Sequence, residues 1–340
     1  MTRQEIEKYI ELIGFSLIDG ESNKWKLTIN KYDLKINLNG EFNEWSIDYG
    51  KDIIVNRKTT SNFSQEENKV VLECVVRLLK KGYPANSIEL EKNWRVGGFL
   101  DIYVKDSKGK AYLMIECKTW GKEYNKALRI LLENNESKEQ ILNYYINDKN
   151  AKFLTLYTSQ INSTGNIDYL SNIIKTDSFA KANNQKEVYN IWDKVFYTKG
   201  IFEQGINPYN ITFLGITRKD LKSIDHSYLT PETNDDGSIF NRFAEILRRH
   251  TISDKSNAYN KIFNLFLCKI VDEDNAVDEN YEMEFQWKYS ESSTDVIYRL
   301  SDLYKKGMKE YMDLEIADVS EDDFDKELLN IVSQINGKTK

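Results

Sequence analysis

The chain has 340 residues, of which 40% are hydrophobic and 30% are charged, and its formal net charge at pH 7 is −7. This composition is typical of a globular protein with room for two or three domains, and it excludes an intrinsically disordered chain. No run of the sequence approaches the roughly 20 consecutive apolar residues that cross a bilayer, so we expect no membrane partner.

Cysteine and histidine are scarce, which excludes several kinds of site. The three cysteines, Cys74, Cys117 and Cys268, are far apart and form no CxxC pair. They neither build a disulfide framework nor a zinc site, so we expect a reducing, cytoplasmic location. With only two histidines, we expect neither a histidine-based catalytic triad nor a histidine-rich metal site.

The first 60 residues predict a small α/β extension. Apolar residues at helical spacing indicate a helix over about 3–14, and alternating residues over 24–39 and 44–50 indicate short strands. The Asn39-Gly40 pair predicts a hairpin turn in this layer.

Residues 61–200 predict an α/β domain. Ser64 and Glu67 have the spacing of a capping box, and the helix that follows is expected to stop at Gly82. Two strands, over 97–106 and 110–118, are expected to pair through a turn. Helices over about 123–133 and 138–147 and a strand over 152–159 complete the unit. The expected fold class is therefore a mixed sheet flanked by helices.

Residues 201–340 predict a linker followed by an α-helical domain. Helical patterns occupy 239–252, 257–273, 293–312 and 322–335. Charge differs between the parts of the chain: residues 64–160 contain 16 basic and 13 acidic residues, whereas residues 230–340 contain 14 basic and 24 acidic ones. The middle of the chain is therefore the better candidate to face a polyanion.

Opposite charges lie at the end of the second strand of the 61–200 domain. Alternation places Glu116 and Lys118 on one face of that strand and Cys117 on the other. Asp101 lies in the paired strand among apolar residues, where a lone carboxylate is costly. Two carboxylates on adjacent strands repel, and a hard divalent cation such as Mg²⁺ relieves that repulsion.

The order Asp…Glu-x-Lys on hairpin-linked strands resembles the core of PD-(D/E)XK nucleases. Asp101, Glu116 and Lys118 match that motif, although Leu100 replaces the proline that often precedes the aspartate. Gln140 resembles the glutamine of the QxxxY helix found in one subgroup of the family. The similarity covers residues 64–160, which resemble nuclease domains of type I-like and fused, type IIG-like restriction-modification enzymes. This resemblance implies a restriction-endonuclease-like fold.

Two further residues match elements of this family. Tyr144 takes the place of the QxxxY tyrosine, and Glu73 takes the place of a glutamate on the helix before the strands. Each of the supporting residues also has a structural interpretation. Gln140 and Ser137 have capping-box spacing, Tyr144 is compatible with core packing, and Glu73 could belong to an acidic helix face.

The resemblance implies a reaction and roles for these residues. Asp101, Glu116 and the main-chain carbonyl of Cys117 would bind Mg²⁺, with Mn²⁺ as a substitute. Lys118 would orient a metal-activated water that hydrolyses a phosphodiester bond of double-stranded DNA. The remaining residues, Glu73, Gln140 and Tyr144, would support the site or touch the DNA backbone.

The helical part resembles the N-terminal region of N6-adenine DNA methylases. The similarity is clearest over "NKIFNLFLCKIVDE" and extends loosely over 238–330. No glycine-rich SAM loop or NPPY-like motif is found, so methylase and specificity domains or subunits of the same system are the expected partners. Two alternatives to a DNA endonuclease stay open: a catalytically silent DNA-binding or assembly scaffold, and an RNA-directed nuclease.

Overall fold

The chain divides into two compact units. The structure, a computed structural model, describes residues 2–94, 98–132, 140–203, 207–209, 211, 215–218, 255–286, 288 and 291–315, without the side chains of 255–262 and 293. One unit comprises Met1–Trp192 with Lys199–Thr212, and the other Asp193–Thr198 with Phe213–Lys340. The finer division of the first unit at residue 60 stays a prediction.

The first unit begins with a helix and a four-stranded antiparallel sheet. Helix α1 (Arg3–Ile13) starts at a capping box formed by Thr2 and Glu5, and it ends at Gly14 with φ 112°. The sheet has the order β1-β2-β3-β4. Its strands are β1 (Ser16–Leu17), β2 (Lys24–Ile29), β3 (Tyr32–Asn37) and β4 (Ser46–Asp48). A 3₁₀ turn, Phe42–Glu44, precedes β4.

The sheet contains a hairpin that was not predicted, with a tight turn between β2 and β3. Ile29 pairs with Tyr32, so Asn30 and Lys31 form a two-residue turn with φ values of 49° and 70°. Two positive φ values are what the right-handed twist of a hairpin favours, and asparagine tolerates them. The Asn39-Gly40 pair lies in the longer connection from β3 to β4, which also pair antiparallel, so a hairpin is present where this pair predicted one.

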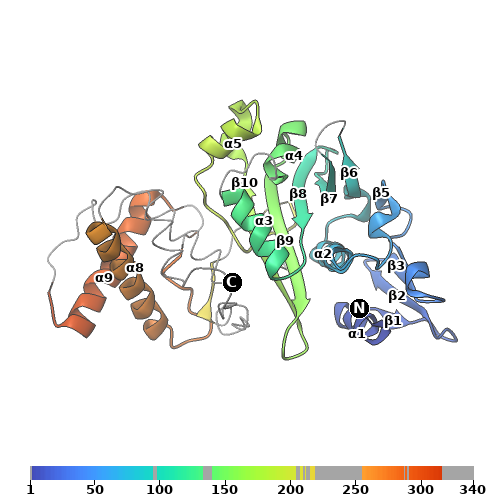
Figure 1. Cartoon of the computed structure of the whole chain (residues 1–340), viewed down its shortest axis with the longest axis horizontal. Helices are drawn as coiled ribbons and strands as arrows, with labels where there is room; N and C mark the ends of the chain where they lie inside the picture. Colours follow the sequence, from blue (N-terminus) through green and yellow to red (C-terminus); the bar gives the residue numbers. More distant parts are fainter. Residues whose placement is uncertain are drawn as a thin grey trace. The chain divides into compact units, whose positions relative to one another are not determined.

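A six-stranded mixed sheet forms the centre of the first unit (Figure 1). Its strand order is β10-β9-β8-β7-β6-β5, with β5–β6 and β8–β9 parallel and the other neighbours antiparallel. The strands are β5 (Ile54–Val55), β6 (Ile88–Asn93), β7 (Phe99–Lys105), β8 (Ala111–Cys117), β9 (Phe153–Ile161) and β10 (Ile167–Lys175). Every residue of β8 is buried, which explains its nearly continuous apolar sequence.

Helices cover both faces of this sheet. Helix α2 (Glu67–Lys81) packs on the face of Cys117, where the thiols of Cys74 and Cys117 meet. Helices α3 (Lys122–Leu132) and α4 (Ile141–Asn147) cover the other face, where the Tyr103 hydroxyl donates to Asp148 Oδ2 at 2.7 Å just after α4. A short helix, α5 (Gln185–Ile191), contacts α4. The remaining 3₁₀ turns are Lys58–Thr60, Ala85–Ser87 and Asp177–Lys181.

The described part of the second unit contains two long helices, α8 (Lys255–Asn275) and α9 (Ser293–Met312), that pack against each other. A glycine allows their close approach, because a Cβ atom at Gly307 would lie 2.7 Å from Cγ of Leu267. Helix α9 begins at a capping box formed by Ser292 and Asp295.

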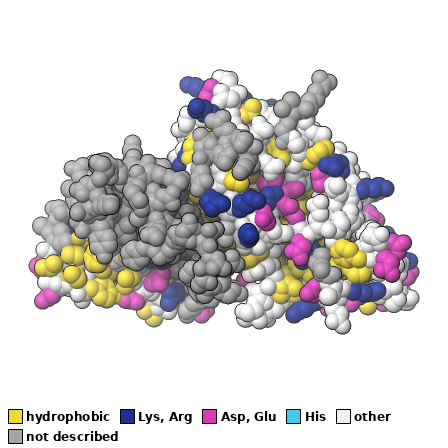
Figure 2. Space-filling model, in the orientation of Figure 1, with side chains coloured by type: hydrophobic (Ala, Val, Ile, Leu, Met, Phe, Trp, Pro, Cys, Tyr) yellow, Lys and Arg dark blue, Asp and Glu magenta, His cyan; other side chains and the backbone are white. Residues whose placement is uncertain are grey.

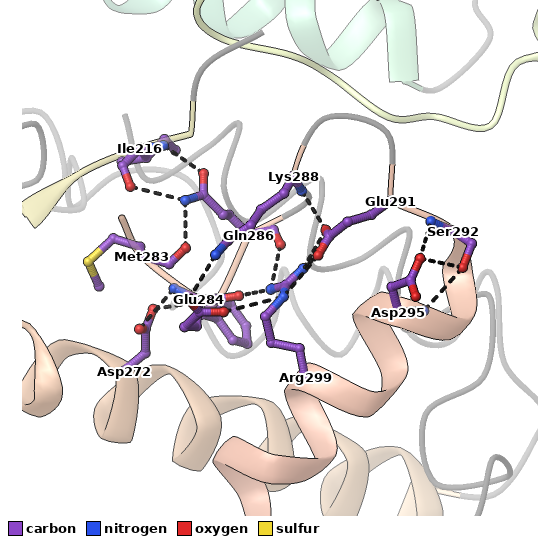
Figure 3. A network of polar contacts seen from close by, with 11 residues as sticks. Ile216, Asp272, Met283, Glu284, Gln286, Lys288, Glu291, Ser292, Asp295 and Arg299 are labelled. Atoms are coloured by element: carbon purple, nitrogen blue, oxygen red, sulfur yellow. Dashed lines mark hydrogen bonds and ion pairs between the residues drawn. The ribbon is translucent and has the colours of Figure 1, made fainter. Parts of the chain in front are cut away.

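A polar network fixes the segment between these two helices (Figure 3). The Arg299 guanidinium donates to the Glu291 carboxylate at 2.6 Å and to the main-chain carbonyls of Glu284 and Gln286. The buried carboxylate of Asp272 accepts the main-chain N–H of Glu284 at 2.9 Å. Because these groups satisfy one another, the network is structural.

The structure confirms the expected fold class: a mixed α/β sheet flanked by helices, followed by an α-helical part. The strands β6 and β10 were not predicted. The helices expected over 239–252 and 322–335 lie outside the described residues. Within the described parts of the chain, every helix is too short or too polar to cross a lipid bilayer.

Candidate functional site

Two acidic side chains meet across strands β7 and β8. The antiparallel register pairs Ile102 with Ile115, and one further step places Asp101 opposite Glu116. Residues opposed in this way project from the same face, with Cβ atoms about 4.5–5.5 Å apart. The main-chain N–H of Cys117 donates to Asp101 Oδ2 at 2.7 Å, which fixes the aspartate against β8. The structure therefore brings the two predicted carboxylates together.

A lysine completes this cluster. Lys118 follows β8 directly, and its ammonium donates to Glu116 Oε1 at 2.7 Å, to Glu67 Oε1 at 2.7 Å and to the main-chain oxygen of Cys117 at 2.8 Å. The Lys118 side chain is 20% exposed and that of Glu116 is 7% exposed. Figure 2 shows basic and acidic side chains side by side near the middle of the view, over the region of α2 and α3 in Figure 1.

Burial and repulsion both oppose charge on the two acids. Burial raises the pKa of Asp101 well above its usual range, and the Glu116 carboxylate raises it further. Burial also raises the pKa of Glu116, against the opposing effect of Lys118. Burial alone would lower the pKa of the Lys118 ammonium, yet the carboxylates around it, led by Glu116, raise it overall. The single ammonium of Lys118 therefore does not balance the negative charge of Asp101 and Glu116. A further cation bound beside them would balance it.

One oxygen of the cluster has no partner. Glu116 Oε2 is buried and accepts no hydrogen bond from any described residue. Carboxylate and carbonyl oxygens are the ligands that Mg²⁺ and Mn²⁺ prefer. The carbonyl oxygen of Cys117 keeps a second lone pair beside Lys118. The residues present thus fit a hard divalent cation.

The protein would supply few ligands to such a cation. Among the described residues, no group of three or more His, Cys, Asp or Glu side chains is placed to hold a metal ion. The ion would therefore be held by Asp101, Glu116 and the Cys117 carbonyl, with water completing its coordination. Mg²⁺ commonly keeps several waters and binds through one or two carboxylates, so this donor set is sufficient.

Glu67, which the sequence analysis assigned to a helix cap, belongs to this cluster. The N-cap of α2 is Glu66, whose side chain makes no capping hydrogen bond, and the Ser64 hydroxyl bonds to Asn62 instead. The predicted capping box of Ser64 and Glu67 is therefore wrong. The Glu67 carboxylate bonds to the ammonium of Lys118, a stronger partner than a main-chain N–H. No local pattern could have revealed a contact between residues 51 positions apart.

Glu73 contacts Arg77 and Tyr157, and among the described residues it makes no hydrogen bond or ion pair with Asp101, Glu116 or Lys118. Its buried carboxylate pairs with Arg77 and accepts the hydroxyl of Tyr157 at 2.5 Å. The Arg77 guanidinium donates to the Tyr157 oxygen at 2.9 Å and lies 3.9 Å from the ring centroid of Tyr169. Glu73 thereby joins α2 to β9. Six residues separate it from Glu67 on the helix, which turns the two side chains away from each other.

We expect Glu73→Ala to lower the free energy of unfolding by about 3–5 kcal/mol, because it leaves a largely buried arginine without its counter-ion. Urea unfolding followed by circular dichroism measures the loss. Glu66→Ala, an exposed position at the start of the same helix, is the control and should change stability by less than about 0.5 kcal/mol. A Glu73→Ala protein of normal stability that had lost activity would instead indicate a direct role in the site.

The QxxxY residues lie beside the strand that contains Asp101. Tyr144 in α4 is buried, and its hydroxyl donates to the main-chain carbonyl of Phe99 at 2.8 Å. Phe99 starts β7 two residues before Asp101, so Tyr144 supports this strand. Gln140 is the exposed N-cap of α4, and its amide makes no hydrogen bond with any described residue. Ser137, its expected capping partner, lies outside the described residues.

The geometry defines a class of site: two opposed carboxylates and an ammonium at the end of neighbouring strands in a mixed sheet. The sequence matches no protein-family model and no curated protein. The function is therefore inferred from what this cluster can do chemically. It can bind a hard divalent cation, and it can place an ammonium beside a water or a phosphate oxygen.

Proposed function

We propose that the chain is a Mg²⁺-dependent endonuclease of the PD-(D/E)XK type that hydrolyses phosphodiester bonds in double-stranded DNA. The observation that supports it is the opposed pair Asp101 and Glu116, with a buried, unpartnered oxygen on Glu116 and the ammonium of Lys118 alongside. Local charge agrees, since residues 64–160 have three more basic than acidic residues in a chain of net charge −7.

Each residue of the cluster has a role in this proposal. Asp101, Glu116 and the Cys117 carbonyl would hold Mg²⁺ or Mn²⁺, which when bound supplies Lewis-acid stabilisation of phosphate charge and a more acidic water. The raised pKa of Lys118 keeps its side chain protonated, so it acts as a donor that orients the attacking water and offsets charge on phosphate oxygens. Glu67 holds that ammonium in place from α2.

The proposal includes the cellular setting. We infer a restriction-modification system in the cytoplasm, where the three cysteines would stay as thiols. Choice of the DNA sequence would depend on methylase and specificity domains or subunits, because the proposed site acts on the phosphodiester backbone, which has the same chemistry at every base.

Supercoiled plasmid incubated with Mg²⁺ or Mn²⁺ tests the proposed activity. We expect nicked and linear products from the wild-type chain, and none from Asp101→Ala or in the presence of EDTA. Asp19→Ala, an exposed aspartate in the first unit, is the matched control. A wild-type protein that binds the plasmid without cutting it would indicate the scaffold alternative, and cleavage confined to structured RNA would indicate the RNA-directed one.

A further inference from the structure

An exposed arginine lies over an aromatic ring close to Asp101. Arg57 follows β5, an edge strand of the six-stranded sheet, and its guanidinium carbon lies 4.2 Å from the ring centroid of Phe99. Phe99 and Asp101 are alternate residues of β7. Their side chains therefore project from the same face, roughly 7 Å apart along the strand.

The hydrogen-bonding groups of Arg57 are available. Lys92, another cation near this end of the sheet, pairs with Glu89 at 3.0 Å. The buried carboxylate of Glu91 accepts the hydroxyl of Thr59 at 2.7 Å. Among the described residues, by contrast, no carboxylate or carbonyl accepts a hydrogen bond from the Arg57 guanidinium. Its N–H donors are thus open to a ligand.

The main chain of Phe99, under Arg57, is held in place. The main-chain carbonyl of Phe99 accepts the Tyr144 hydroxyl at 2.8 Å, and the Tyr144 ring lies 5.8 Å from that of Trp94. A guanidinium that already packs against a ring loses less conformational freedom when it binds. The N–H groups of a guanidinium lie at the edges of its plane. Those edges match two oxygens of a phosphate.

We propose that Arg57, stacked on Phe99, is a substrate-positioning residue that binds a backbone phosphate next to the one at Asp101 and Glu116. The inference depends on the proposed nuclease function for the identity of its ligand. A phosphate is favoured over a base, because it is an anion and two of its oxygens match the paired N–H groups of the guanidinium. The position on the strand of Asp101 suits a phosphate one to two nucleotides away, at about 3.4 Å of rise per nucleotide.

Binding of a short fluorescent DNA duplex in EDTA, measured by anisotropy over a salt series, tests this inference with the full chain. We expect Arg57→Ala to weaken binding about tenfold and to reduce the magnitude of the salt slope by about 1, the loss of one phosphate contact. Arg57→Lys should keep the salt slope but bind the duplex less tightly, because an ammonium cannot make two parallel hydrogen bonds to one phosphate. Phe99→Leu should weaken binding while keeping the charge.

A matched control separates this contact from general charge effects. Lys108→Ala removes an exposed cation in the turn at the other end of β7 and should leave affinity and slope unchanged. Unchanged binding by Arg57→Ala, or a wild-type chain that does not bind the duplex, would overturn the inference. If Arg57→Ala fails to fold, Arg57→Lys with wild-type affinity would overturn it equally.

Plasmid cleavage by the wild-type chain distinguishes failure of the nuclease proposal from failure of the phosphate contact. Duplex binding that depends on Arg57, without any cleavage in Mg²⁺, supports the contact and contradicts only the nuclease. Cleavage with no dependence of binding on Arg57 supports the nuclease and contradicts the contact.

Discussion

Replacing Lys118 with alanine is expected to reduce the rate of plasmid cleavage at saturating Mg²⁺ by about 100-fold or more, the size seen when a charge-stabilising donor is removed from an active site. The ammonium contacts Glu116 and Glu67 and would face the phosphate. Without it, the two acids should attract a divalent ion at least as strongly. The loss should therefore appear in the rate and not in Mn²⁺ affinity, which calorimetric titration measures.

The design must separate chemistry from folding. The alanine variant leaves the buried Glu116 without its counter-ion, so rates are compared well below its melting transition, followed by circular dichroism. Lys118→Arg retains the charge and should recover part of the rate. Lys122→Ala removes an exposed lysine at the start of α3 and should cut normally. Wild-type cleavage by Lys118→Ala would refute the role assigned to this residue.

Asp101→Asn is expected to abolish cleavage and yet to stabilise the metal-free protein by about 1–2 kcal/mol, the usual size when an unfavourable active-site group is neutralised. The raised pKa of Asp101 shows that folding disfavours its charged form. An asparagine removes the charge, while its carbonyl can still accept the N–H of Cys117. Urea unfolding in EDTA at pH 7 measures the gain.

The pH dependence gives an independent check on this expectation. A carboxyl group whose pKa is raised by folding makes the protein less stable as pH rises above the ordinary carboxyl pKa, because the folded state then binds more protons than the unfolded state. The extra stability of Asp101→Asn over wild type should therefore shrink towards about pH 3, where the Asp101 carboxyl of wild type is protonated in both the folded and the unfolded state. Asp19→Asn, at an exposed position, should change stability by less than about 0.5 kcal/mol.

Added Mn²⁺ should make the wild-type protein more stable than Asp101→Asn, the reverse of their order in EDTA. A cation that binds only the folded state stabilises it in proportion to the logarithm of its concentration over the dissociation constant. Wild type should gain stability with Mn²⁺, and Asp101→Asn should gain little. Equal stabilisation of both proteins, or a loss of stability in Asp101→Asn without metal, would contradict a metal site at this aspartate.

Local sequence rules determined the elements that depend on neighbouring residues. The presence of α2 followed from its apolar spacing, and its C-terminal end followed from Gly82, whose φ of 108° ends the helix. The hairpin of β7 and β8 followed from two apolar runs joined by a turn, and residue alternation predicted Glu116 and Lys118 on one face, where the two side chains bond. These inferences needed only the period of a helix or strand, which the sequence contains.

The tertiary structure alone decided which distant side chains meet. It brought Glu67 to Lys118, placed Glu73 against Tyr157, and laid Arg57 over Phe99. A sequence pattern specifies the face of an element that a side chain occupies, but not the element packed against that face. A contact across 51 or 84 residues depends on how helices and strands pack, and packing is set by the whole core at once.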